Sequence, residues 1–444
     1  MKGYESYKNS GVEWIDIIPS NWKIGALKHC FKFKVGFTPP TSNEKFYVDV
    51  DSNEGHDWVT IGDLNSKYIF NSKHKISDLA AESYNKDIIP KGSLLYSFKL
   101  SVGKVAFAGK DIYTNEAIFS ILPDDNLELS YYYYCLPTIL IHNANENIYG
   151  AKIFNQEVIK NSKLPIPTKV EQTAIASFLD YKTNLIDATI EKKKRLIALL
   201  KEKRQAVINE AVTKGLNPNA PMKNSGVESL GEIPEDWNLV PLRYLYNKIG
   251  SGVTPKGGGD VYTDEGVTFI RSQNVHFDGL RLDDVVKIDI ETHQKMNNSS
   301  VEFNDVLLNI TGASIGRCCV VNIEEEMNVN QHVCIIRVNE RIKPDFLNVV
   351  LQSNVGQTQI KLLTTGGNRE GLTQEAVKNM SIPLPNIETQ IQLLNSITEK
   401  MKSFDLIKNK IETAIEKLQT YRQSLISEAV TGKIDVRNWE ITKD

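Results

Sequence analysis

The stretch from Val170 to Lys214 constrains the fold of this chain more than any other part of it, because it contains neither Pro nor Gly. Its apolar residues recur at spacings of three, four and seven positions, at Ile175, Leu179, Ile186, Ile190, Ile197, Leu200, Val207 and Ala211. This spacing is typical of a coiled coil. One continuous helix over the stretch would measure ~65 Å. A helix of that length cannot bury its apolar stripe inside one small domain, so the sequence predicts a partner helix.

A second stretch, from Gln390 to Val430, has the properties expected of that partner. It also lacks Pro and Gly, and its heptad-like stripe consists of Ile391, Leu394, Ile397, Met401, Phe404, Ile411, Ile415, Leu418 and Leu425. Both stretches follow a Pro-x-Pro segment, and both end in similar residues, at 205–213 and 423–431. The offset between these two endings is 218 positions. The two helices therefore belong to an internal repeat.

The repeat extends over most of the chain, although its offset drifts between 213 and 218 positions, as expected when insertions lie in loops. The matched segments are 8–13 with 223–228, Ile18-Pro19 with Ile233-Pro234, Trp22 with Trp237, Gly36 with Gly252, Leu94-Leu95 with Leu307-Leu308, 101–104 with 314–317, Asn115 with Asn330, and Gln156-Glu157 with Gln374-Glu375. Short apolar runs of strand type alternate with helical runs in each half, which predicts an α+β domain used twice. Trp22 and Trp237 are expected to pack in the core at each domain entry.

These patterns predict an α+β fold in which two pseudo-twofold-related α/β domains are separated by two long antiparallel coiled-coil helices. The expected boundaries are 1–165 for the first domain, 166–214 for the first long helix, 215–385 for the second domain, 386–432 for the second long helix and 433–444 for a C-terminal tail. Two similar domains held apart in opposite orientation suit a two-part target such as two half-sites on DNA.

Composition restricts the location and the partners. A net charge of −3 argues against indiscriminate nucleic-acid binding, although it is compatible with a local basic groove. The five cysteines are odd in number and lack metal-type spacing, and Cys318-Cys319 is expected to face both sides of one strand. No apolar run resembles a signal peptide or approaches the ~18–20 residues that cross a bilayer. We therefore expect a reduced, cytoplasmic protein without membrane contact.

Motifs of catalysis are missing from the sequence. Residues 312–317 lack the spacing and the Lys of a phosphate-binding loop, and the seven His form no metal-ligand cluster. Residues 36–40 resemble an adenine-methyltransferase loop only superficially, because Thr38 replaces the Asn or Asp and Thr41 replaces the aromatic residue. The sequence therefore predicts a non-enzyme with no catalytic residue and no metal.

In its motifs and their order, the whole chain resembles the specificity subunit of type I restriction-modification systems. The resemblance is carried by residues 226–237 at the opening of the second domain, by the Pro-x-Pro segments, and by the Glu171-Gln172 pair that enters the first long helix. The first domain has a worn form of the same opening at 14–17, and the second helix has Thr389-Gln390 in place of Glu-Gln.

The resemblance implies two target-recognition domains that each read one half of an asymmetric, bipartite sequence in double-stranded DNA. The long helices would fix the spacer and dock two modification (methyltransferase) subunits, which hold S-adenosylmethionine and methylate an adenine flipped from the stack. Two restriction subunits, with ATP and Mg, would cleave unmodified DNA in phage defence. This chain would bind no cofactor and would supply sequence choice and scaffolding.

Candidate DNA-binding residues are polar side chains on turns beside the predicted strands. Arg and Lys read guanine or bind phosphate, and Asn and Gln read adenine. The candidates are Lys99, Ser101, Lys104, Tyr149, Lys152 and Gln156 in the first domain, and Arg271, Gln273, Asn274, Ser314, Arg317, Gly367, Asn368 and Arg369 in the second. A surface or structural role is the alternative for each of them.

Two other hypotheses for the whole chain stay open. A coiled-coil adaptor that binds only proteins would make no sequence-specific DNA contact. A fused restriction enzyme would need methyltransferase or nuclease motifs, which were not found in the sequence.

Overall fold

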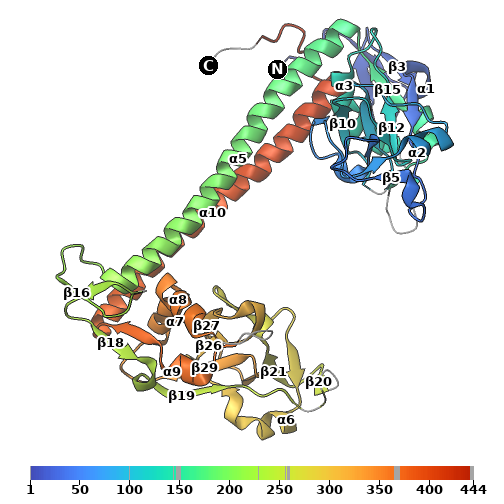
Figure 1. Ribbon diagram of the computed structural model, residues 1–444. Helices are drawn as coiled ribbons and strands as arrows, with labels where there is room; N and C mark the ends of the chain where they lie inside the picture. The colour runs from blue at the N-terminus through green and yellow to red at the C-terminus, as the bar shows by residue number, and fades with distance from the viewer. Residues whose placement is uncertain are drawn as a thin grey trace. The chain divides into compact units, whose positions relative to one another are not determined.

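The computed structural model of the protein describes residues 2–99, 101–143, 145–146, 152–228, 230–255, 257, 261–364 and 371–440, with the backbone alone at 145–146 and 152–153. The chain divides into two compact units. Unit 1 comprises Met1–Lys193 and Thr413–Asp444, and unit 2 comprises Lys194–Glu412. Each unit contains its own sheets and one half of each of two long helices (Figure 1).

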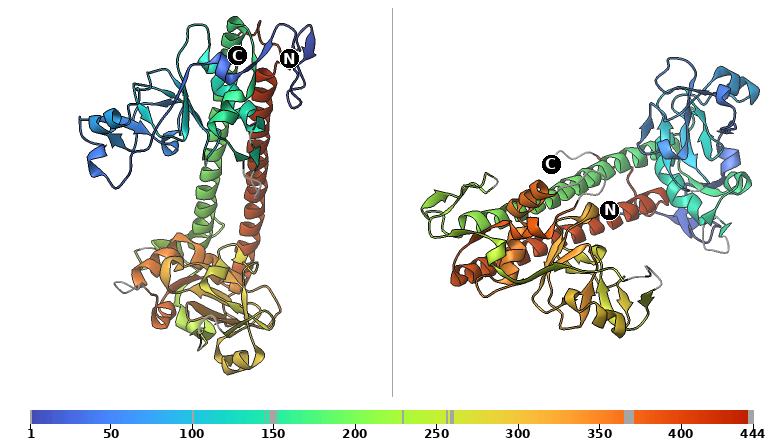
Figure 2. Two further views of the ribbon diagram at one scale, coloured as in Figure 1. Left: turned by 90° about the vertical axis from the view of Figure 1, so that its right-hand side faces the viewer. Right: turned by 60° about the horizontal axis from the view of Figure 1, so that its bottom comes forward.

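The two predicted long helices are confirmed as α5 (Lys169–Lys214) and α10 (Ile387–Val430). In unit 1 the first half of α5 packs with the last part of α10, and in unit 2 the last half of α5 packs with the first part of α10 (Figure 2). The pairing is therefore antiparallel in each unit, as predicted.

Most of the predicted stripe is buried or half-buried. Ile391 is an exception with 42% exposure. In this turn of α10, the side chains of Gln390 and Leu393 are the ones that are buried in unit 2.

One ion pair between the long helices recurs in each unit. In unit 1, Arg422 of α10 donates Nε and Nη2 to the two carboxylate oxygens of Asp187 of α5, at 2.9 and 3.1 Å. In unit 2 the helices exchange roles, and Arg204 of α5 contacts Asp405 of α10 at 2.7 Å. Asp187 matches Asp405, and Arg204 matches Arg422, at the offset of 218 seen in the sequence.

Unit 1 is built on two main sheets with small additional pairs. The larger sheet has the order β4 (Phe33–Val35), β12 (Ile118–Ile121), β9 (Leu94–Ser97), β10 (Val105–Ala108), β7 (Tyr68–Ile69). The second has the order β11 (Tyr113–Thr114), β6 (His56–Val59), β8 (Lys75–Ile76), β5 (Tyr47–Val48). The pairs are β1 (Tyr7–Asn9) with β2 (Ile17–Pro19), β3 (Lys23–Ala26) with β15 (Lys163–Ile166), and β13 (Asn145–Glu146) with β14 (Lys152–Ile153). Its shorter helices are α1 (Leu27–Cys30), α2 (Asp78–Ser83), α3 (Leu129–Ile139) and α4 (Gln156–Asn161).

Unit 2 repeats this plan. One sheet has the order β19 (Tyr246–Ser251), β29 (Val333–Val338), β26 (Val306–Asn309), β27 (Cys318–Val320), and the other has β20 (Tyr262–Thr263), β24 (Val286–Ile288), β21 (Val267–Ile270), β28 (Met327–Val329), β25 (Ser300–Val301). The pairs are β16 (Met222–Asn224) with β17 (Glu232–Pro234), β18 (Asn238–Pro241) with β30 (Ser381–Leu384), and β22 (Val275–His276) with β23 (Gly279–Leu280). Its shorter helices are α6 (Ile290–Lys295), α7 (Pro344–Gln352), α8 (Asn354–Leu363) and α9 (Gln374–Lys378). The predicted α+β domain used twice is therefore confirmed.

The strand pairing corrects one detail of the sequence repeat. Leu94 and Val306 begin strands that pair in the same register with β12 and β29, so they are the equivalent residues. Leu94 and Val306 face the core beside the long helices, and Leu95 and Leu307 face the core on the other side of the sheet. The sequence match of Leu94 with Leu307 and of Leu95 with Leu308 is therefore wrong by one residue. Such a slip exchanges the two faces of a strand.

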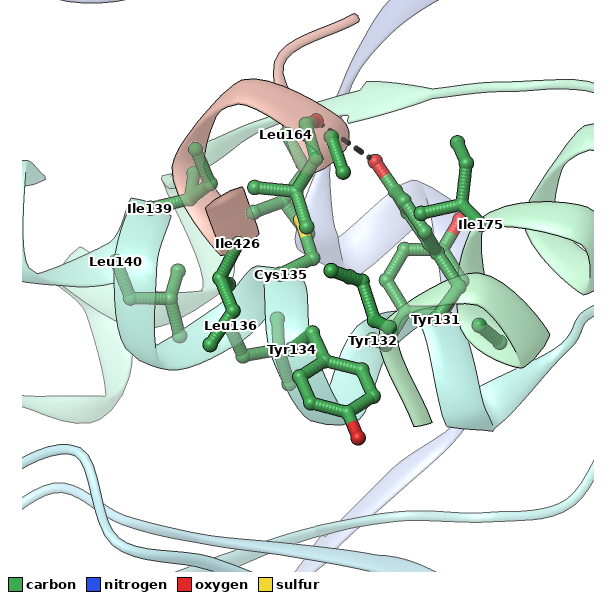
Figure 3. Packing of buried hydrophobic residues seen from close by; sticks show 14 of the residues in the cluster. Tyr131, Tyr132, Tyr134, Cys135, Leu136, Ile139, Leu140, Leu164, Ile175 and Ile426 are labelled. Carbon is green, nitrogen blue, oxygen red and sulfur yellow. Dashed lines mark hydrogen bonds between the residues drawn. The ribbon is translucent and has the colours of Figure 1, made fainter. Parts of the chain in front are cut away.

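Helix α3 carries the tyrosine-rich part of the unit 1 core, between the larger sheet and the long helices (Figure 3). Tyr131 and Tyr132 are fully buried, and the Tyr131 hydroxyl donates to the Val430 carbonyl at the end of α10, at 3.0 Å. Burial of an aromatic side chain of this size stabilises a fold by about 1.5–3 kcal/mol. The end of α10 is thereby held on unit 1.

A buried glutamine joins each long helix to its unit. Gln172 Oε1 accepts from the backbone N–H of Glu128, which precedes α3, at 2.9 Å, and Gln390 Oε1 accepts from that of Lys343, which precedes α7, at 2.8 Å. In both cases the side-chain Nε2 donates to a proline carbonyl five residues earlier, at 3.0 Å. The two long helices are therefore attached to their units by equivalent hydrogen bonds.

The predicted core roles of Trp22 and Trp237 are confirmed by exposures of 0% and 2%. Cys318 and Cys319 face two different cores from strand β27, as predicted. Among the helices of the described residues, none is both long and apolar enough to cross a membrane.

Candidate nucleic-acid interface

Three loops meet at one end of the unit 1 strands, and we call them the unit 1 loop cluster: 60–67 after β6, 98–99 with 101–104 between β9 and β10, and 115–117 between β11 and β12. The third loop lies between the other two. The backbone N–H of Asn115 donates to the Val59 carbonyl at the end of β6, at 2.9 Å, and the Ala117 carbonyl accepts from the Phe98 N–H at 3.0 Å.

The same three loops meet in unit 2, at 271–274, 310–317 and 330–332, and form the unit 2 loop cluster. Asn330 N–H donates to the Ile270 carbonyl at 3.0 Å, and the His332 carbonyl accepts from the Ile310 N–H at 3.0 Å. Asn115 and Asn330 each also accept, through Oδ1, from the backbone two residues later, at 3.2 and 3.1 Å. This is the usual way in which an Asn shapes a turn. The two clusters therefore share one backbone arrangement.

In each unit a glycine directly follows a strand, β4 in unit 1 and β19 in unit 2, and allows the chain to pass close to the loop cluster. A Cβ on Gly36 would lie 1.9 Å from the Thr114 carbonyl oxygen, and a Cβ on Gly252 would lie 1.9 Å from the Val329 carbonyl oxygen. Real Cβ atoms do not come this close to an oxygen, so each position requires Gly. The 36–40 segment, which superficially resembles a methyltransferase loop, thus has a structural reason for its glycine.

In the first loop of each cluster, a side-chain oxygen accepts from the backbone N–H three residues earlier. The backbone N–H of Thr60 donates to Asp63 Oδ2 at 2.8 Å, and that of Arg271 donates to Asn274 Oδ1 at 3.0 Å. Asn274 Nδ2 donates to the Arg281 carbonyl at 2.9 Å, and only 2% of this residue is exposed. Both ends of its amide are therefore bonded within the loop.

The second loop of unit 1 carries three of the candidates. Lys99 is exposed, with Nζ 5.9 Å from the ring centroid of Phe98. The Ser101 carbonyl accepts from Ser97 Oγ at 2.5 Å. Lys104 Nζ donates to Asn65 Oδ1 at 3.3 Å and thereby links the second loop to the first. Lys99 is thus the more exposed of the two lysines, and Lys104 connects two loops.

The second loop of unit 2 carries Ser314 and Arg317. Ser314 ends the short turn η8 (Gly312–Ser314) and is half-buried. Asn309 Nδ2 donates to the Ser272 carbonyl at 2.7 Å, so the first and second loops are linked here as well. Within the described part of the chain, the Arg317 guanidinium has no hydrogen-bond or ion-pair partner, and it lines a groove beside the long helices.

Arg271 and Gln273 lie on the first loop of unit 2. Arg271 stacks on Tyr262, with 5.8 Å between its guanidinium carbon and the ring centroid, and donates Nη2 to the Asp284 carbonyl at 3.4 Å. Its buried Nε has no partner among the described residues. Gln273 is exposed, and its carbonyl lies 2.9 Å from His276 Nε2. One cation and one amide are thus presented from a fixed loop.

The remaining candidates lie away from these loops or outside the described residues. Gln156 is exposed at the first position of α4, which contacts α1 and η3 (Leu140–Asn143). Lys152 pairs with Glu146 in the β13–β14 hairpin, where the structure describes only the backbone. Tyr149, Gly367, Asn368 and Arg369 lie outside the described residues. Gly371, directly after that last segment, forms a bridge with Thr311 of the unit 2 loop cluster.

Three polar residues near the loops were missed in the sequence. Asn65 receives the Lys104 ammonium, and His276 and Arg281 lie on the β22–β23 hairpin that follows the first loop of unit 2. The Thr60-x-x-Asp63 capping box marks a turn close to Asn65 and is visible in the sequence. His276 and Arg281 had no comparable signal, because their position depends on a two-residue strand pair.

The side chains of the two clusters are of the kinds that bind nucleic acid. The clusters present Lys, Arg, Gln and backbone groups, which pair with phosphates and base edges. Among the described residues, no group of three or more His, Cys, Asp or Glu is arranged to hold a metal ion.

Comparison with known proteins places the chain in a family. The model of the type I restriction modification DNA specificity domain matches residues 19–200 and 234–418. The EcoBI specificity subunit of Escherichia coli is 28% identical over 370 residues, which cover 79% of this chain and 77% of that protein. The putative MjaX specificity subunit of Methanocaldococcus jannaschii is 27% identical over 451 residues, which cover 97% and 98%.

Solved structures share the fold. A chain from a study of assembly and conformational transition of the type I R-M system has a TM-score of 0.71 at 14% identity, over 94% of this chain and 99% of that one. The HsdS subunit of Thermoanaerobacter tengcongensis has a TM-score of 0.52 at 15% identity, over 94% and 98%. The two repeated domains and the match to the family model show that the chain belongs to the family of type I restriction-modification DNA specificity subunits.

Proposed function

We propose that this chain reads an asymmetric, bipartite sequence in double-stranded DNA, with one half-site for each loop cluster. The observation that carries this proposal is the repetition of one backbone arrangement with different exposed or half-buried side chains. Lys99 and Lys104 stand in the unit 1 loop cluster, and Arg271, Gln273 and Arg317 stand in the unit 2 loop cluster. Identical supports with different reading groups suit two independent half-sites.

The individual residues take different roles in this proposal. Arg271 and Gln273 are suited to base edges, because a guanidinium pairs with guanine and an amide with adenine. Lys99, Lys104, Ser101, Ser314 and Arg317 are suited to phosphates. Asn274 shapes the loop, since its amide is already bonded there. Tyr149, Lys152, Gln156, Gly367, Asn368 and Arg369 remain candidate DNA contacts in this proposal.

The long helices set the spacer between the half-sites and dock two modification subunits and two restriction subunits. S-adenosylmethionine belongs to the modification subunits, and ATP and Mg belong to the restriction subunits. This chain contributes recognition and scaffolding and performs no catalysis itself.

The ruler role has a direct test. A heptad inserted into 191–203, with a matched heptad in α10, lengthens the helix pair by about 10 Å, which is about three base pairs of DNA. The methylated motif of this variant should have a spacer longer by about that amount. An unchanged spacer would contradict the ruler role.

The test of the whole proposal is a methylome. The chain is co-expressed with its modification subunit in a host without adenine methylation, and modified adenines are mapped by direct sequencing. We expect one asymmetric motif in two short halves with a fixed, unspecified spacer. A stable complex that produces no new methylation would favour the protein-only adaptor instead.

A further inference from the structure

Unit 2 contains a groove that lies outside the proposed base-reading positions. It has a volume of about 820 Å³ and is bounded by the two long helices on one side and by the β22–β23 hairpin on the other. Ile197, Leu200 and Phe404 provide apolar surface along the helices. We call this feature the α5–α10 groove.

Positive charge dominates the rim of the α5–α10 groove. Five cations line it, from both long helices, the hairpin and the β26–β27 loop: Lys201, Arg204, Arg281, Arg317 and Lys408. Two carboxylates line it as well, and each is already engaged, Asp405 with Arg204 at 2.7 Å and Asp278 with Arg281 at 3.3 Å. Lys408 lies 3.6 Å from Glu412, one turn further along α10, in a solvent-exposed pair that a phosphate can replace, because such pairs contribute little stability.

Two more of the five cations form no ion pair with any described residue. Lys201 is exposed, and neither Lys201 nor Arg317 has a side-chain partner within the described part of the chain. Lysine stems can lie along apolar surface while their ammonium groups reach water. The apolar helix surface therefore supports the cations and does not by itself call for an apolar ligand.

The α5–α10 groove is continuous with the unit 2 loop cluster. Arg317 belongs both to the cluster and to the rim of the groove. His276, another rim residue, lies 2.9 Å from the carbonyl of Gln273 in the first loop. The hairpin is also fixed to the helices, because Gln352 donates to the Phe277 carbonyl and accepts from Gln205 of α5, at 2.9 and 3.1 Å. A duplex that is read by the loops would thus pass the cations of the groove.

We propose that the α5–α10 groove binds the sugar–phosphate backbone of DNA beside the half-site read by the unit 2 loop cluster, an inference that rests on the proposed function. Lys201, Lys408 and Arg317 contact phosphates of the unspecified spacer there. These contacts add affinity without reading sequence, because phosphates are the same at every base pair.

The counterpart position in unit 1 is occupied by the protein's own side chains. Lys67 lies there with its ammonium group 5.3 Å from the Tyr133 ring centroid. Lys67 is itself paired with Asp180 of α5 at 2.5 Å. The spacer contact is therefore specific to the unit 2 side of the target.

The test uses the complete complex with its modification subunit, on a duplex that carries the motif found in the methylome. The double variant Lys201→Gln/Lys408→Gln is compared with Lys203→Gln/Lys410→Gln, which removes the same charge from exposed positions of the same two helices outside the groove. Dissociation constants are measured by fluorescence anisotropy over a series of KCl concentrations.

We expect the slope of log affinity against log salt to become shallower by about 1.8 in the groove variant, since each phosphate contact contributes about 0.9. The control pair should keep the wild-type slope, and both should keep the wild-type methylated motif. A Lys201→Arg/Lys408→Arg variant should restore the slope, because it restores the charge. Ethylation of spacer phosphates should interfere with binding on the unit 2 side alone.

Two results would overturn the inference. Equal slopes for the groove variant, the control and the wild type would exclude a phosphate contact. Loss of the modification subunit from the groove variant, detected by native mass spectrometry, would show that an acidic protein segment occupies the groove. Either result leaves the proposed function intact if the wild type methylates a bipartite motif, whereas absence of any motif in the wild type contradicts the proposed function itself.

Discussion

Units 1 and 2 share one sheet plan and one helix joint, but they differ where the domain meets the long helices. In unit 1 this region is packed with aromatic rings and an ion pair, from Tyr133, Tyr134, Lys67 and Asp180. In unit 2, Asn348 stands at the position of Tyr133, counted from the residue that precedes each helix, and an open groove remains. The repeat therefore preserves the backbone that carries the loops and varies the surface beside it.

The entry of the long helices differs in the same way. Thr168 and Glu171 form a capping box at α5, and the Glu171 carboxylate also accepts from Asn21 and Trp22. At α10 the matching Asn386 accepts from the backbone of Thr389 at 2.9 Å, and no carboxylate is buried there. The start of α5 in unit 1 thus holds a buried carboxylate, whereas the start of α10 in unit 2 holds a neutral amide.

The largest expected effect tests whether both units require glycine at the equivalent position next to the loop cluster. Gly252→Ala places a Cβ 1.9 Å from a carbonyl oxygen, so the strand must move, and we expect unit 2 to lose about 3 kcal/mol or more of unfolding free energy. Gly36→Ala should do the same to unit 1. Hydrogen–deuterium exchange resolved by unit measures both.

Gly250→Ala is the matched control, because a Cβ there has no atom within 4 Å. It should leave the exchange of unit 2 nearly unchanged. If Gly252→Ala were tolerated as well as Gly250→Ala, the close approach of the strand to the loop cluster would be contradicted.

The second-largest effect is a loss of unfolding free energy that should occur in unit 1 alone. Lys67→Met leaves Asp180 without its ammonium partner at a half-buried site, which should cost unit 1 about 1–3 kcal/mol. Unit 2 should be unaffected. Chemical denaturation followed by unit-resolved exchange is the measurement, and Lys73→Met, at an exposed lysine of the same domain, is the control. Equal responses to the two variants would exclude a stabilising role for the Lys67–Asp180 pair.

The pH dependence should also differ. Burial alone raises the pKa of the Glu171 carboxyl, but hydrogen bonds from Asn21, Thr168 and Trp22 outweigh it and hold the pKa below its ordinary value. A lowered folded-state pKa stabilises unit 1 above the unfolded-state pKa, and this stabilisation is lost as the pH falls through the folded-state value.

Glu171→Gln should therefore cost unit 1 about 1–2 kcal/mol at pH 7, since it replaces charge-assisted hydrogen bonds, and less in acid. Unfolding curves from pH 7 down to about pH 3 measure this difference. Thr389→Ala in unit 2 should show no comparable pH dependence. A Glu171→Gln penalty that is constant over this range would contradict the sign of the pKa shift.

The smallest effect concerns the ion pair between the long helices, which both units contain. The ion pairs Arg422–Asp187 and Arg204–Asp405 are partly exposed, so a double-mutant cycle on each should give a coupling below about 1 kcal/mol. The two couplings should be alike and should weaken with salt. A coupling several times larger in one unit would show that the aromatic packing of unit 1 or the open groove of unit 2 changes the strength of the shared pair.

The repeat and the long helices could be predicted because each rests on a pattern visible along the chain. A seven-residue apolar period needs no knowledge of tertiary structure, and neither do two Pro-x-Pro segments 218 positions apart. The register of β26 could not be predicted in the same way. Val306, Leu307 and Leu308 are all apolar and all buried, so the sequence does not distinguish the two faces of the strand.

The candidate site was predictable only in part. Lys104 and Arg317 were found because they are basic residues on turns beside predicted strands, and both lie in the loop clusters. The buried role of Asn274 was not foreseeable, because its partner Arg281 is brought back to it by a hairpin of two-residue strands. The groove cations on α5 looked like an ordinary solvated helix face, and only the position of the hairpin distinguishes Lys201 from Lys203.

The most direct test of two independent reading units is a domain exchange. Residues 223–385 are replaced by the corresponding segment of another family member with a known motif, and the methylome of the resulting complex is mapped. If each loop cluster reads its own half-site, one half of the motif changes, while the other half and the spacer remain. A motif that changes in both halves, or in neither, would contradict independent reading by the two units.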